Sequence, residues 1–109
     1  MPERLVRGIN FFNSGRYFEA HEVWEDLWRE ESGPLRSFYQ GLIQAAVGLH
    51  HLQRGNLLGA EAQIHKSLAK LAGYDAVTAG LDVARLRSDL QGCLEVSDPS
   101  KVQIGYANI

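Results

Sequence analysis

The residues with the clearest chemical potential lie close together, in the segment from Tyr17 to Trp28. Within it His21 and Glu25 are four residues apart, which in a helix places them one turn apart on the same face. A helical wheel puts both inside an arc of apolar side chains that includes Trp24. A carboxylate in apolar surroundings needs a partner, because loss of hydration disfavours its charged form. If Glu25 is buried and paired, its replacement by Gln should lower stability by a few kcal/mol.

An imidazole and a carboxylate at this spacing could do chemistry as well as stabilise a helix. His21 and Glu25 could be two ligands of a metal ion or an acid–base pair. Glu22 lies at the edge of the apolar arc, where it could serve as a general base. The competing interpretation is a structural hydrogen bond that fixes how helices pack, with Trp24 and Trp28 as core anchors.

A second imidazole–carboxylate set follows at an offset of 40 residues, the separation of Gly15 from Gly55. At this offset His21 aligns with Glu61 and Glu25 with His65, so each helix carries one residue of each type. If the two helices pack side by side, these four side chains could form two hydrogen-bonded pairs across the helices. They could also hold zinc, iron or manganese, which accept imidazole and carboxylate ligands. Exposure of the second set to solvent is the third alternative.

A narrow polar stripe lies on the helix expected from residue 34 to 54. Gln40, Gln44 and His51 fall close together on its wheel, with Val47 beside them. The stripe is either the solvent side of the helix or the wall of a polar pocket that faces His21 and Glu25. We expect His50 to point elsewhere, at the surface or near the helix end.

The elements that must position these residues are all expected to be helices, since alternation is absent and apolar residues recur at helical spacing. Glycine-containing turns separate them, and the expected helices cover about 2–13, 16–31, 34–54, 56–72 and 82–91. Residues 73–80 are expected to form a loop, and residues 96–109 an irregular tail that lies against the core through Val102, Ile104 and Tyr106. The forty-residue similarity predicts two hairpins like those of tetratricopeptide repeats. Two hairpins are too few for a solenoid, so we expect an all-α compact bundle of about five helices over residues 1–109.

Composition limits the class of protein. The chain has 109 residues and a net charge of −2, without the basic stripe that a nucleic-acid-binding surface requires. The charge-free run from Gln40 to Leu49 is about half of what a bilayer span needs, so we expect neither nucleic acid nor membrane as a partner. The lone Cys93 cannot form an internal disulfide, which favours a cytoplasmic location.

Two blocks of sequence resemble a known family. The first runs from Phe12 to Trp28; the second starts at Gln40-Gly41-Leu42-Ile43-Gln44-Ala45 and continues through His51 and Arg54-Gly55-Asn56 to Ala60. Together they resemble the family of small all-helical domains of unknown function numbered 309, found in bacteria and plants, over roughly residues 5–90. The resemblance implies a compact helical bundle with these motif positions: His21, Glu22, Glu25, Trp28, Gln40, Gln44 and His51. Glu61 and His65 lie outside these blocks.

Two functions follow as hypotheses, and the sequence leaves open whether the protein is an enzyme. The first is a non-catalytic helical module that self-associates or binds a protein partner. The second is a small-molecule or metal-binding protein, for example a hydrolase, in which His21, Glu25 and Glu22 do the chemistry. Gln40, Gln44 and His51 complete its pocket, and the two Gln side chains orient the substrate.

Overall fold

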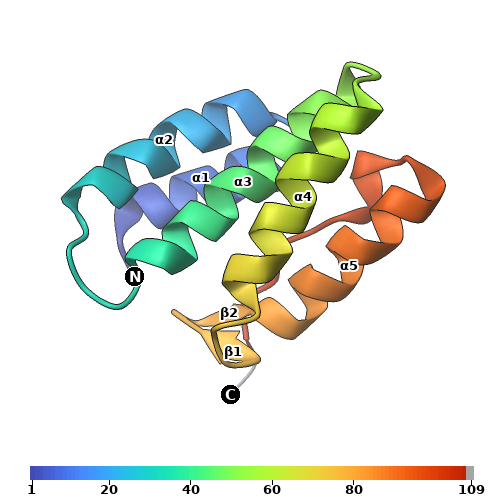
Figure 1. Cartoon of the computed structure of the whole chain (residues 1–109). Coiled ribbons are helices and arrows are strands. Elements are labelled where there is room, and N and C mark those ends of the chain that lie inside the picture. Colours follow the sequence, from blue (N-terminus) through green and yellow to red (C-terminus); the bar gives the residue numbers. More distant parts are fainter. Residues whose placement is uncertain (108–109) are drawn as a thin grey trace.

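The structure is a computed structural model of the chain and describes residues 1–107 (Figure 1). Five helices account for most of it, as expected: α1 Glu3–Asn13, α2 Tyr17–Glu30, α3 Arg36–Gln53, α4 Leu57–Leu71 and α5 Val83–Val96. The first four begin and end within two residues of the expected positions. The minor elements are the strands β1 Val77–Thr78 and β2 Leu81–Asp82 and the short 3-10 helix η1 Pro99–Lys101.

Two expectations about the C-terminal third are wrong in detail. Residues 77–82 form an antiparallel hairpin rather than a plain loop, because Ala79 and Gly80 both adopt positive φ, the requirement of a tight two-residue turn. Helix α5 continues past Gln91 to Val96, because burial of Leu90 and Cys93 on one face outweighs the weak helix preference of Gly92. The helix ends where Ser97 takes the left-handed conformation, with φ of 52°.

The turns after α1 and α3 are copies of each other. Gly15 and Gly55 have φ of 78° and 75°, a region that glycine enters at little cost. In both turns the residue immediately before the next helix bonds back to the preceding helix: Arg16 N–H donates to Phe11 O and Asn56 N–H donates to His51 O, each at 2.9 Å. The forty-residue similarity is therefore a repeated helix–turn–helix unit.

Close helix packing repeats in the same way. A Cβ added to Gly8 would lie 1.9 Å from Trp24 Nε1, and one added to Gly48 would lie 2.7 Å from Ile64 Cγ1. Gly48 and Ile64 follow Gly8 and Trp24 by 40 residues each. Each hairpin therefore has a glycine on its first helix that makes room for a large side chain of its second helix. Whether the hairpins pack as tetratricopeptide repeats do remains a prediction.

Helix α3 is the centre of the molecule. It packs against α2 on one side and α4 on the other, while α1 packs on α2 (Figure 1). Its buried face is almost wholly apolar, as expected for a helix with neighbours on several sides. None of the helices within residues 1–107 combines the length and hydropathy that crossing a membrane would require.

The C-terminal segment returns from α5 to α1. Val102 and Ile104 are buried, and the Asn13 side chain holds the backbone of Ile104 by two hydrogen bonds, of 2.9 Å to its oxygen and 2.8 Å from its nitrogen. Tyr106 differs from expectation, because it stays 48% exposed and only its backbone bridges to Leu81. The last two residues of the expected tail, 108 and 109, lie outside the described residues.

Candidate functional site

Helices α2 and α3 run antiparallel and leave a groove along their outer face. Two cavities lie in it, one at each end. The first, of about 150 Å³, is lined by Tyr17, Phe18, His21, Val47 and His50. The second, of about 180 Å³, is lined by Glu25, Trp28, Gln40, Ile43 and Gln44. We call these the first and second pockets of the α2–α3 groove.

The groove forms because the two helices bring complementary stripes together. On α2 the residues that face it recur at helical spacing, and on α3 the polar stripe faces them from across the boundary. Gln40 and Gln44 therefore line a pocket wall opposite Glu25, which was one of the two alternatives for the polar stripe of this helix. The groove residues are mostly half-buried, between core and solvent.

His21 and Glu25 form a pair within α2. His21 Nε2 lies 3.0 Å from Glu25 Oε1, and Nδ1 lies 3.2 Å from the carbonyl oxygen of Phe18. Both partners are acceptors, so the two bonds form together only when both ring nitrogens carry a proton. The second oxygen of Glu25 accepts from Arg29 Nη2 at 3.2 Å. The Glu25 carboxylate therefore has the hydrogen-bond partners that we expected, although its side chain is 36% exposed rather than buried.

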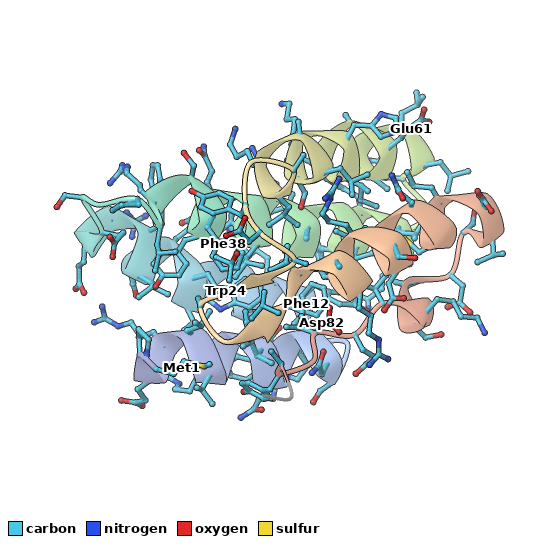
Figure 2. The ribbon with its side chains drawn as sticks, turned by 90° about the horizontal axis from the view of Figure 1, so that it is seen from below. Met1, Phe12, Trp24, Phe38, Glu61 and Asp82 are labelled. Carbon is cyan, nitrogen blue, oxygen red and sulfur yellow. The ribbon has the colours of Figure 1, made fainter. Side chains whose placement is uncertain are left out.

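The pairing across helices suggested by the repeat does not form among the described residues. Helix α3 lies between α2 and α4, and Figure 2 shows Glu61 at the outer edge of α4, on the far side of α3 from Trp24. Glu61 and His65 instead line a separate cavity of about 350 Å³ between α4 and α5, with Leu57, Leu94 and Glu95 among its walls. Within residues 1–107, no three His, Cys, Asp or Glu side chains gather closely enough to hold a metal ion. A metal site at these four residues thus stays a hypothesis without a formed ligand set.

The repeat nevertheless explains why both sets exist. His21 and Glu25 line the boundary between the second helix of the first hairpin and the helix that follows it. Glu61 and His65 line the boundary between the second helix of the second hairpin and α5. The two sets occupy equivalent positions in the two copies, so their likeness reflects shared architecture.

Gln44 has an unusual environment in the second pocket. Its Oε1 atom is buried and has no hydrogen-bond partner among the described residues. An unpaired buried acceptor costs roughly 1–3 kcal/mol. Neighbouring Trp28 is half-buried, and the guanidinium of Arg36 stacks over its ring at 4.1 Å. An unpaired acceptor therefore lies buried behind the wall of the second pocket, close to Trp28.

His50 belongs to the groove, contrary to expectation. Its ring lies 5.7 Å from that of Phe18, which in turn lies 5.4 Å from His21. Burial lowers the pKa of His50, and the charge of Arg54 and the nearby His51 and His21 lower it further. The available signal was its position one turn after Val47, on the same side of α3.

Two motif residues point away from the groove. Glu22 is exposed. His51 lies at the α3–α4 turn, where its Nδ1 is 3.4 Å from Asn56 Nδ2.

Cys93 is buried in α5, and burial, with Asp89 and Asp98 nearby, raises its pKa to about 11. A buried thiol with a raised pKa is a poor nucleophile.

Comparison with known proteins shows which family and which relatives this chain is similar to. A family model described as "Domain of unknown function (DUF309)" matches residues 5–62, which include every residue that lines the two pockets. The chain is 37% identical over 90 residues to the uncharacterized protein YpuF of Bacillus subtilis, covering 80% of this chain and 52% of that protein. It is 26% identical over 105 residues to an uncharacterized protein of Aquifex aeolicus, covering 93% of this chain and 32% of that protein. The chain thus spans about half the length of one relative and a third of the other.

Proposed function

We propose that this chain, which belongs to the DUF309 family of domains of unknown function, is a non-catalytic interaction module. The α2–α3 groove binds a segment of another protein. The matched region of the family contains the whole groove, so the proposal concerns the part of the chain that family members share.

The observation that carries the proposal is the buried, unpaired Oε1 of Gln44 in the second pocket. Buried polar atoms normally have partners, so an exception needs an explanation. Since this oxygen is buried, a bound segment would supply the missing partner once the Gln44 side chain turns toward the groove. The surrounding groove offers the aromatic side chains Phe18 and Trp28, a residue type enriched in protein interfaces.

The hydrolase alternative has less support. Each ring nitrogen of His21 already lies against an oxygen of its own helix, Nδ1 3.2 Å from Phe18 O and Nε2 3.0 Å from Glu25 Oε1, so a metal ion or substrate would have to displace one of these contacts. Among the described residues that line the two pockets, the single hydroxyl is that of Tyr17, and it donates to the carbonyl of Pro99. The groove therefore lacks an activated nucleophile next to its imidazole–carboxylate pair.

Photocrosslinking tests the proposal. p-Benzoylphenylalanine replaces Phe18, whose ring is 50% exposed in the groove, or Ala84, an exposed residue of α5, as the control. In extract of the source organism, the groove position should give a defined adduct with one other protein, and the control position should not. Equal labelling from both positions would contradict the proposal. An adduct of two copies of this chain would overturn the choice of a different protein as partner.

Binding of the identified protein then makes the test quantitative. Phe18→Asp and Gln44→Leu should each raise Kd at least about tenfold, the scale of a central interface residue. Ala84→Asp should leave Kd within about twofold. Unchanged affinity in both groove variants would show that the partner binds elsewhere, even if it crosslinks.

A further inference from the structure

We infer that the cavity between α4 and α5 is a second binding surface, which takes a lysine or arginine side chain of a partner protein. The aliphatic part of that side chain lies against the leucines of the cavity, and its charged end reaches the carboxylates of Glu61 and Glu95. None of the residues that line this cavity lines the two pockets of the α2–α3 groove, so the inference goes beyond the proposed function and does not depend on it.

The cavity forms where the second helical hairpin has no close neighbour. Leu57, Glu61 and His65 of α4 lie 40 residues after three residues of α2 that line the boundary with α3. On α4 the corresponding face meets α5, which diverges from it away from the β-hairpin (Figure 1). The space left there is about 350 Å³, whereas the two pockets at the α2–α3 boundary have about 150 and 180 Å³. This part of α4 is therefore open to a partner.

Apolar side chains form both the walls and the rim of the cavity. Leu52, Leu57 and Leu94 line it. At its rim Leu57 is 55% exposed, and Leu58, the next residue, is 83% exposed. Val96, which lies between two lining residues of α5, is 60% exposed. Exposed apolar side chains that gather at one place and are bordered by polar groups mark contacts with proteins. The rim therefore favours a protein as the source of the cation over a free ion or a small amine.

The charged groups that line the cavity are carboxylates. Glu61 and Glu95 both line it, and its described lining contains no lysine or arginine. Within residues 1–107 neither carboxylate takes part in an ion pair. Other surface glutamates do have such a partner, since Glu19, Glu25 and Glu30 each contact an arginine. A basic side chain brought by a partner would complement this pair of charges.

The end of α5 adds to the negative potential. The C-terminal end of a helix carries a partial negative charge and is stabilised by a nearby cation. The last turn of α5 has no basic residue and contains Glu95 instead. The positive end of α4, where Leu57 lines the cavity, is capped by Asn56, whose side chain accepts from Gly59 N–H at 3.0 Å. The potential of the cavity therefore selects a cation.

The geometry selects an organic cation over a metal ion. Glu61, His65 and Glu95 all line the cavity, but no three such side chains in the described part of the chain converge closely enough to hold an ion. A lysine or arginine side chain carries its charge at the end of an aliphatic stem, which packs on apolar surfaces. Such a side chain fits the leucine walls and the carboxylates at the same time.

Peptide selection tests the inference. A phage library of short random peptides is selected on the wild-type chain and depleted on Glu61→Gln/Glu95→Gln, which removes two exposed charges and keeps the side-chain shapes. We expect the surviving peptides to share a lysine or arginine next to an apolar residue. Depletion on the control Glu3→Gln/Asp75→Asn, which removes two exposed carboxylates elsewhere, should leave these peptides in the pool. Survivors without a basic residue, or no survivors, would overturn the inference.

A double-mutant cycle on one selected peptide measures the contact itself. Replacing its basic residue by norleucine should raise Kd at least about tenfold on the wild-type chain and less than about twofold on Glu61→Gln/Glu95→Gln, because there the charge has already lost its partners. Equal losses on both chains would show that the basic residue binds elsewhere. Leu58→Ser should also raise Kd, by at least about threefold, whereas Val77→Ser, an exposed apolar residue of the β-hairpin, should leave it within about twofold. Equal effects of the two serine variants would contradict the role of the rim.

Sedimentation of the chain alone distinguishes a different protein from a second copy as the partner. We expect the wild type and Glu61→Gln/Glu95→Gln to have the same mass at every concentration. A dimer that forms in the wild type and dissociates in this variant would assign the cavity to a second copy of the chain, and would overturn the choice of a different protein.

Discussion

At the scale of single residues, most of the side chains that line the groove are half-buried, between core and solvent. His21 and Glu25 have side-chain exposures of 20% and 36%, which allows them to be paired and reachable at once. The same intermediate exposure governs what each residue contributes to stability, because water still screens its charge.

The Glu25 carboxylate should contribute little to stability. Since it is partly exposed, Glu25→Gln should lower the free energy of unfolding by less than about 1 kcal/mol, rather than the few kcal/mol expected of a buried pair. Urea denaturation measures this, with Glu19→Gln as the control, because Glu19 makes a comparable exposed pair with Arg16. A loss several times larger than that of the control would mean that Glu25 is more buried than its exposure indicates.

Two glutamines of α3 should respond oppositely to the same change. Gln44→Leu removes an unpaired buried oxygen and should leave stability unchanged or raise it by about 1 kcal/mol. Gln53→Leu removes a 2.8 Å hydrogen bond to the carbonyl of Gly15 and should lower it by about 0.5–1.5 kcal/mol. Thermal and urea unfolding of the two variants distinguish these outcomes. If Gln44→Leu is the more damaging substitution, Gln44 is a structural residue and not a binding one.

Cys93 should make stability depend on alkaline pH. Its folded pKa, about 11, lies above the ordinary value of 9.0, so the unfolded chain loses this proton first as pH rises. The contribution to stability is complete below about pH 9 and is lost progressively toward pH 11. Cys93→Ala should therefore show a smaller fall in stability over this range than the wild type, whereas Tyr17 and Tyr39, whose pKa values burial also raises, contribute equally to both. Identical pH profiles would contradict the buried neutral thiol.

At the scale of elements, the molecule is a duplicated hairpin with an added α5 and tail. The duplication extends beyond the turns to the glycine on each first helix and the large side chain it admits. This is why the α2–α3 boundary, formed between the two copies, has an equivalent at the α4–α5 boundary. The second boundary is wider, because α5 diverges from α4 away from the β-hairpin (Figure 1).

The glycines of the helices should differ sharply in their tolerance of a methyl group. Gly8→Ala would place Cβ against the Trp24 indole, and such overpacking costs about 1–3 kcal/mol. Gly92→Ala, with no atom within 4 Å of the new Cβ, should instead stabilise α5 by about 0.5–1 kcal/mol. The midpoints of urea unfolding measure both changes. Similar effects for the two substitutions would mean that Trp24 moves aside freely.

At the scale of the whole molecule, the tail ties the C-terminal end to the first helix. Residues 102–104 pass beside α1, where Ile104 and Val102 complete the core. Among the described residues, Asn13 is the side chain that bonds both the N–H and the C=O of Ile104, and Gln103 adds a longer contact from its Nε2 to the Asn13 carbonyl at 3.5 Å.

Asn13→Ala should therefore be costly. It removes two hydrogen bonds and leaves the N–H and C=O of Ile104 without partners in a partly buried place, with an expected loss of about 2–3 kcal/mol. Asn10→Ala, an exposed change on the same helix, is the control and should alter stability by less than about 0.5 kcal/mol. Hydrogen exchange at Ile104 measured alongside should show loss of protection only in Asn13→Ala. An unaltered tail would mean that burial of Val102 and Ile104 alone holds it.

The local signals in the sequence were sufficient for the helices and for one part of the site. Periodicity gave each helix and glycine gave the turns, because both act through the backbone within a few residues. Asn56 and Asp82 cap α4 and α5 by accepting hydrogen bonds from the backbone N–H groups of Gly59 and Arg85, a role that Asn and Asp commonly have at the start of a helix. The contact between His21 and Glu25 follows from four-residue spacing alone, since one helix places both partners.

The sequence did not determine which helices lie side by side. Every contact between helices therefore had to come from the tertiary structure. The repeat correctly related His21 to Glu61, but α3 separates their helices, and sequence spacing holds no information about that order in space. His50 joined the groove because the α2–α3 boundary passes its side of α3. Gln44 is notable only because no described donor reaches its buried oxygen, and an absence of neighbours can be recognised only after every helix has been placed.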